Sequence, residues 1–74
     1  MHPAEGIDYL KKMLNEGKGL EPIFIIRGQD IVSGQAVIAW VAAATRAGAP
    51  VHKTIRAEEI GEEMNKWPVK KVPD

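Results

Sequence analysis

Four glutamates in the last third of the chain are the densest group of side chains that could bind a metal ion. Helical steps of three and four residues would place Glu59 on one face with Glu62 or with Glu63. Carboxylate sites on helices normally draw further ligands from a partner helix, often as a Glu-x-x-His motif. The chain has no such motif. We therefore expect a solvated acidic face and no metal centre.

Other reactive residues are few and lack partners at a useful spacing. His52 has no second His, Cys or acidic residue placed for ligand or general-base chemistry, and Ser33 lies outside any Gly-x-Ser-x-Gly motif. The glycines match neither phosphate-binding fingerprint. Structural zinc requires Cys and His, and the chain has no Cys and two His. We predict no catalytic, cofactor or metal site, and a protein that is not an enzyme.

Arg27, Gln29 and Asp30, around Gly28, form the most distinctive polar cluster. They lie between an apolar run and a predicted helix, where an anion could meet the free N–H groups of the helix start. The alternative, which we favour, is structural. In it, Ser33 or Asp30 caps the helix and Arg27 forms an ion pair.

A nucleic-acid interface is the third chemistry to weigh. A helix-turn-helix match is incomplete, because Ala44 and Gly48 fit but Thr54 stands where an apolar residue is needed. The second helix of that hairpin carries the glutamates, which phosphates would repel. Ten basic and ten acidic residues leave no net charge, which argues against this function. The alternative would use Lys53, Arg56, Lys66, Lys70 and Lys71.

Three segments have the pattern of helices: residues 3–16, 34–47 and 50–66. The first and third begin with proline and have apolar residues at steps of three and four, which predicts one buried face each. The second is apolar on all sides over residues 36–44, as in helices at the centre of an assembly. The tight turn before Pro50 predicts that the second and third helices form an antiparallel hairpin.

The apolar run Ile23-Phe24-Ile25-Ile26 is the one convincing strand candidate. Because apolar and polar residues do not alternate in it, we expect both faces to be buried. A lone strand leaves its backbone N–H and C=O groups without partners. The segment therefore either pairs with another strand or lies as extended chain satisfied by side chains and water. The fold class is thus mostly α, with one short strand or extended segment between the first two helices.

Size and composition favour self-association. We expect residues 1–74 to form a single small domain with a flexible tail at 69–74. Such a domain often needs a disulfide, a bound metal or a partner subunit for stability. Without Cys, a partner subunit is the option that remains. We predict a two-fold homodimer, which could pair two copies of residues 23–27. Trp40 is expected in the core, and Trp67 in the core or an interface. The candidate interface residues are Ile23, Phe24, Ile25, Ile26, Val37, Trp40, Val41 and Trp67.

Several stretches carry a family resemblance. They are Pro22 to Asp30, Trp40, Ala47 to Pro50, Lys53, Met64 to Trp67, and Val72 to Asp74. Through them the chain, from Glu21 onward, resembles small uncharacterised proteins encoded by bacteriophages and prophages. The resemblance implies a bacterial or phage cytoplasmic origin and brings no activity or site residues.

The sequence leaves three functional hypotheses. The favoured one is a non-enzymatic protein-interaction or self-assembling accessory module, whose partner is itself or another protein. The alternatives are a small nucleic-acid-associated regulator and an enzyme whose site forms only at a subunit interface. We expect a cytoplasmic protein, because there is no Cys, no signal-peptide pattern, and no apolar run near the roughly 20 residues that span a bilayer.

Overall fold

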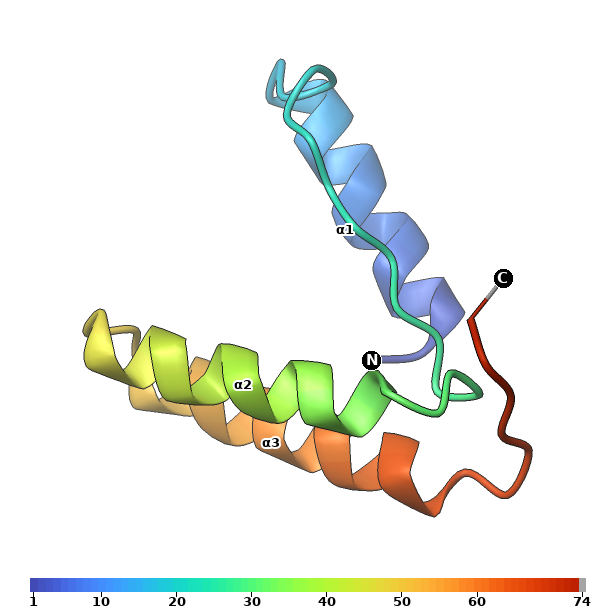
Figure 1. The fold of residues 1–74 in the computed structure, drawn as a ribbon. Helices are drawn as coiled ribbons and strands as arrows, with labels where there is room; N and C mark the ends of the chain where they lie inside the picture. Colours follow the sequence, from blue (N-terminus) through green and yellow to red (C-terminus); the bar gives the residue numbers. More distant parts are fainter. Residues whose placement is uncertain (74) are drawn as a thin grey trace.

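The computed structural model describes residues 1–73 and contains three helices (Figure 1). Helix α1 spans Pro3–Asn15, α2 spans Ser33–Arg46 and α3 spans Val51–Lys66. The predicted mostly helical fold is confirmed, and each helix boundary lies within one residue of its expected position. In the described residues, no helix is both long and apolar enough to cross a membrane.

Helices α2 and α3 form the predicted antiparallel hairpin (Figure 1). Gly48 follows the end of α2 with a φ of +87°, a left-handed conformation that glycine adopts without strain. Backbone hydrogen bonds from Gly48 to Thr45 (3.1 Å) and from Ala49 to Ala44 (3.0 Å) close the helix end. Pro50 then starts the return, so the reversal takes few residues and holds the two helices side by side.

Small residues line the contact between α2 and α3. A Cβ atom built on Gly61 would lie 3.3 Å from Cγ1 of Val37, and one built on Gly34 would overlap the side-chain amide of Asn65. Ser33, at the start of α2, is fully buried. The two helices therefore approach closely with little apolar volume between them, and their larger apolar side chains are left outside the contact.

Helix α1 stands away from the hairpin, and the chain has the outline of an open V (Figure 1). After the helix, Gly17 takes a φ of +76° and the N–H of Lys18 donates to the carbonyl of Met13 (2.9 Å). The chain then runs back along α1 to reach α2. Within residues 1–73, α2 and α3 are the one pair of helices that pack along each other.

Residues 23–26 are extended but do not form a strand, so the prediction that both faces are buried is wrong. Phe24 is 87% exposed and Ile25 is 71% exposed. In the described chain, the one bridge of β type lies elsewhere, between Asp30 and Lys71. The physical reason is that no other extended segment in the described chain pairs with residues 23–26. The segment therefore lies as extended chain, the second of the two arrangements that the sequence allows.

The C-terminal segment, predicted to be a flexible tail, is attached to the loop before α2. The N–H of Lys71 donates to the carbonyl of Gln29 (2.8 Å), and the N–H of Ile31 donates to the carbonyl of Lys71 (2.9 Å). The ammonium group of Lys70 donates to the carbonyls of Gly28, at 3.0 Å, and of Met64. These bonds fasten the chain end beside the start of α2. Asp74 lies outside the described residues.

Candidate interaction surface

Large apolar side chains dominate the surface. Among the described residues, Met13 is the one apolar side chain of any size that is buried, at 8% exposure. Apolar side chains that remain mainly exposed come from all three helices and from the segments between them. A typical domain buries such side chains in a contiguous core. The chain therefore has enough large apolar side chains for a core, but the fold leaves most of them exposed.

The candidate interface residues are distributed over both arms of the V. Trp40 is 53% exposed, so the expectation that it belongs to the core is wrong. The reason is that α3 contacts the side of α2 that carries Gly34 and Val37, and Trp40 lies outside this contact. Trp67 is exposed as well. The remaining candidates differ in exposure: Ile23, Phe24 and Ile25 are exposed, and Ile26, Val37 and Val41 are half-buried.

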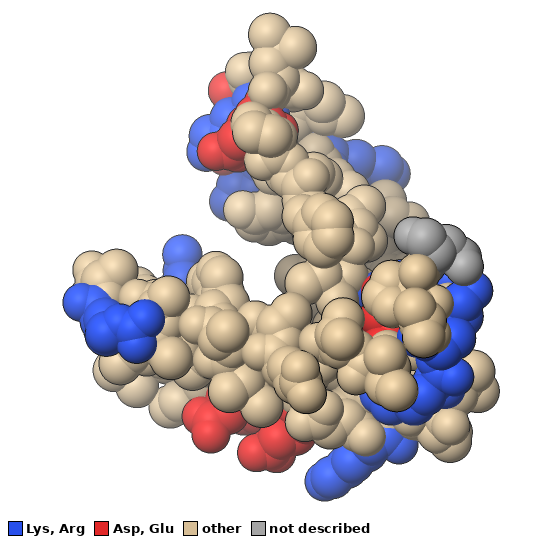
Figure 2. Space-filling model, viewed as in Figure 1, with Lys and Arg blue, Asp and Glu red and all other residues tan. Residues whose placement is uncertain are grey.

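The total exposed area is too large for a chain of this mass. The structure exposes 6006 Å². A compact monomer of 8.1 kDa is expected to expose about 4,500 Å². The excess is therefore about 1,500 Å² per chain, judged against that scaling of area with mass. Figure 2 shows that the hairpin arm is mostly uncharged on the side facing the opening of the V, whereas acidic and basic side chains gather towards the tip of the other arm.

One hollow lies along a flank of the hairpin and combines apolar and acidic residues. Its lining consists of Ile38 and Val41 from α2 and Glu58 and Glu62 from α3, and its volume is about 230 Å³. The sequence pattern placed Val41 among the interface candidates but missed Ile38, although the two are three residues apart on one helix face. We call these four residues the acidic hollow.

A second hollow, of about 260 Å³, lies between α1 and the chain that returns along it. The Glu16 carboxylate lies 3.1 Å from the ammonium group of Lys18 at this end of α1 and raises the pKa of Lys18. The lining residues are Leu10, Met13, Leu14, Lys18, Gly19, Glu21 and Ile23. This hollow is the main apolar contact between α1 and another part of the chain.

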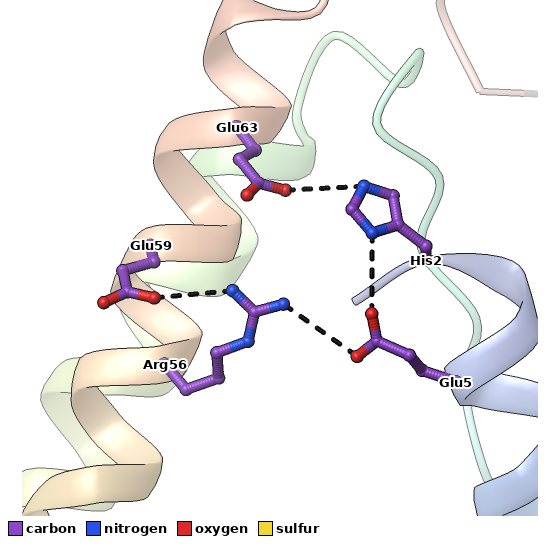
Figure 3. Close-up of polar contacts among 5 residues, drawn as sticks. All are labelled: His2, Glu5, Arg56, Glu59 and Glu63. Atoms are coloured by element: carbon purple, nitrogen blue, oxygen red, sulfur yellow. Dashed lines mark hydrogen bonds and ion pairs between the residues drawn. The ribbon is translucent and has the colours of Figure 1, made fainter.

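Exposed ion pairs join the start of α1 to α3 (Figure 3). The His2 ring lies 3.5 Å from Glu5 and 3.9 Å from Glu63, and Arg56 lies 3.9 Å from Glu5 and 3.4 Å from Glu59. The pKa of Glu5 is lowered, first by a hydrogen bond from the His2 backbone and further by the His2 side chain and Arg56. Exposed pairs of this kind stabilise little, so the angle between α1 and the hairpin is weakly held.

The polar cluster at residues 27–30 shapes the backbone of its own loop. The Asp30 carboxylate accepts a hydrogen bond from the N–H of Arg27 (3.4 Å), and the N–H of Asp30 donates to the carbonyl of Arg27 (3.0 Å). Within residues 1–73 the Arg27 guanidinium forms no ion pair, so the ion pair predicted for Arg27 is not found there. Gln29 contributes the carbonyl that accepts from Lys71.

The predicted helix caps are also wrong. Ser33 is the first residue of α2, which begins after Val32 without a side-chain cap. The Ser33 hydroxyl instead donates to the carbonyl of Gly28 (3.4 Å), and Asp30 closes a turn through its backbone, accepting from the N–H of Ser33 (2.9 Å). The chain packs closely against α3 here, so the buried hydroxyl is directed into the loop.

The basic candidates for a nucleic-acid interface do not gather on one face. Lys53 is near the start of α3 and Lys66 is its last residue, about 20 Å apart along the helix axis. Arg56 faces Glu59 and Glu5, and the Lys70 ammonium group bonds backbone carbonyls. Figure 2 shows basic side chains in separate groups at the two ends of the hairpin.

The glutamates of α3 divide between two sides of the helix. Glu59 and Glu63 face Arg56 and His2, whereas Glu58 and Glu62 line the acidic hollow. Within residues 1–73, no three His, Asp or Glu side chains gather as metal ligands would. Comparison with protein-family models, curated proteins and solved structures found no match. The resemblance to phage proteins therefore stays a prediction.

Proposed function

We propose that this chain is a non-enzymatic, self-assembling module and that its working unit is a homodimer. The observation that carries the proposal is the excess of exposed area, about 1,500 Å² above the expectation for a compact monomer. If each copy buried that excess against the other, the interface would total about 3,000 Å², within the range of obligate homodimers. The large exposed apolar side chains of both arms supply the apolar area that such interfaces contain.

Association would also stabilise the fold. Buried apolar area contributes about 25 cal/mol per Å², so an uncovered surface of this size represents a large part of what a small domain needs. The ion pairs between α1 and α3 are exposed and cannot replace that contribution. A second copy pressed against both arms would hold the angle between them. A cytoplasmic location belongs to the same proposal and rests on the sequence, which has no Cys.

The test is the mass in solution, measured by light scattering on a size-exclusion column over a wide concentration range. We expect twice the chain mass of 8.1 kDa. Trp40→Glu should shift the mass toward the monomer, because it places a charge on the apolar face of α2. Gln35→Glu is the matched control, since it adds the same charge to an exposed polar position of that helix. A wild-type chain that stays monomeric at every concentration would refute the proposal.

A further inference from the structure

The acidic hollow is open on the flank of the hairpin that the chain's own α1 does not approach. Glu63 and Arg56 face the start of α1, through His2 and Glu5 (Figure 3). Glu62 precedes Glu63 by one residue and is therefore displaced by about 100° around the helix. The chain's own α1 is thus committed to one side of α3, and the hollow faces outward on another. A helix that docks there would therefore come from another molecule.

The walls of the hollow define the chemistry of that occupant. Ile38 and Val41 supply apolar area, and the Glu58 and Glu62 carboxylates are one helical turn apart along one edge. A complementary surface needs an apolar stripe with a basic residue beside it. Helices dock into such grooves through residues at positions i, i+3, i+4 and i+7.

Helix α1 carries this pattern on one face, whose Leu10 and Leu14 also line the second hollow. Ile7, Leu10, Lys11 and Leu14 stand at positions i, i+3, i+4 and i+7. Ile7 is 52% exposed and Leu14 is 65% exposed, and the Lys11 side chain is exposed between them. The second half of the helix is basic, whereas the acidic Glu5 lies in its first turn. Apolar residues and charge therefore both complement the acidic hollow.

We propose that α1 of a second copy docks into the acidic hollow, with Ile7 and Leu14 against Ile38 and Val41 and with Lys11 facing Glu58 and Glu62. This inference rests on the self-association proposed above and names the contact that produces it. In a two-fold dimer each copy gives one α1 and receives one, so the contact forms twice. It covers surfaces on both arms of the V.

Charge reversal tests the contact directly. Lys11→Glu places a third carboxylate against Glu58 and Glu62 in its own homodimer, and Glu62→Lys replaces one of the two carboxylates facing Lys11 with a positive charge. Each variant alone should weaken dimerisation at least tenfold. Mixed in equal amounts, the two variants should recover a heterodimer, because the unchanged Lys11 of one chain then meets the unchanged Glu58 and Glu62 of the other, and the two reversed charges meet each other. Lys12→Glu is the matched control, since it makes the same change about 100° around α1 and should leave dimerisation unchanged.

The readouts are light scattering for each variant and native mass spectrometry for the mixture, with circular dichroism to check helix content. If either variant loses its helices, the neutral pair Lys11→Gln and Glu62→Gln replaces it, and dimerisation should then become less sensitive to salt. A wild-type dimer whose affinity survives both reversals overturns this contact and leaves self-association standing. A heterodimer no stronger than the two variant homodimers also overturns it. A monomeric wild type removes the proposed function and this contact with it.

Discussion

Two glycines that lie inside helices, Gly6 and Gly61, have different surroundings. Gly61 is buried, and any Cβ there meets the branched side chain of Val37, which has little freedom to move. At Gly6 a Cβ would meet only the end of the flexible Met1 side chain, 3.6 Å away. Gly61 therefore sets how closely α2 and α3 approach, whereas Gly6 only weakens α1.

Substitutions at these glycines should have opposite effects on stability. Gly61→Leu should lower the free energy of unfolding by about 1–3 kcal/mol, because it overpacks the hairpin contact. Gly6→Ala should raise it by up to about 1 kcal/mol, the difference in helix propensity. Urea unfolding followed by circular dichroism at a fixed protein concentration measures both. A Gly61→Leu chain as stable as the wild type would show that the hairpin contact is loosely packed.

At the scale of elements, the helices and the hairpin could be predicted because their signals are local. Proline at the helix starts and glycine behind their ends act within one turn of chain, and they placed the boundaries closely. The burial of the extended segment could not be predicted, because an apolar run has the same sequence whether it is buried or exposed. Ser33 as a cap and Trp40 as a core residue failed for a related reason: both assignments depend on which side of α2 meets α3.

The link between α1 and α3 should weaken in acid. The pKa of Glu5 is lowered in the folded chain, mainly by the hydrogen bond from the His2 backbone and in smaller part by Arg56 of α3, so the folded state binds this proton less tightly than the unfolded state. Its stabilising contribution is therefore complete above the ordinary value of 4.5 and is lost as the pH falls through the lowered pKa. Distances between spin labels on cysteines introduced at Lys12 and His52, with labelled chain diluted in unlabelled chain, should broaden in this range.

Glu5→Gln provides the control for that measurement. The variant lacks the titrating carboxylate, so its label distances should change less in acid than those of the wild type. An unchanged wild-type distance distribution from neutral pH to below 4.5 would mean that these ion pairs do not set the position of α1.

At the scale of the whole molecule, the chain is more open than its length predicts. Its radius of gyration is 13.3 Å. A compact domain of this length is expected near about 11.3 Å. The difference has the same origin as the excess area, since two arms joined at one end enclose little between them. Local sequence patterns do not determine such an opening, because it depends on whether surfaces on different elements meet.

If a second copy covers these surfaces, thermal stability must depend on protein concentration. A tenfold increase should raise the Tm by a few degrees, because association draws the folded monomer into the dimer by mass action. Melting curves at several concentrations measure this directly, and the Trp40→Glu chain should show a much smaller dependence. An identical Tm at all concentrations for the wild-type chain would indicate that folding and association are not coupled.

The short reversal at Gly48 has a consequence for the order of events in folding. It makes the contacts between α2 and α3 close in sequence, and chains with such contacts fold quickly. We therefore expect the hairpin to form early in each newly made chain, while Phe24 and its neighbours are exposed. If the chain dimerises as proposed, dimerisation requires an encounter between two chains. The time that each chain spends as a monomer therefore shortens as the concentration of the chain rises. Exposed extended segments can also join the wrong partner. A low rate of synthesis would thus prolong the interval in which this chain is most prone to aggregate.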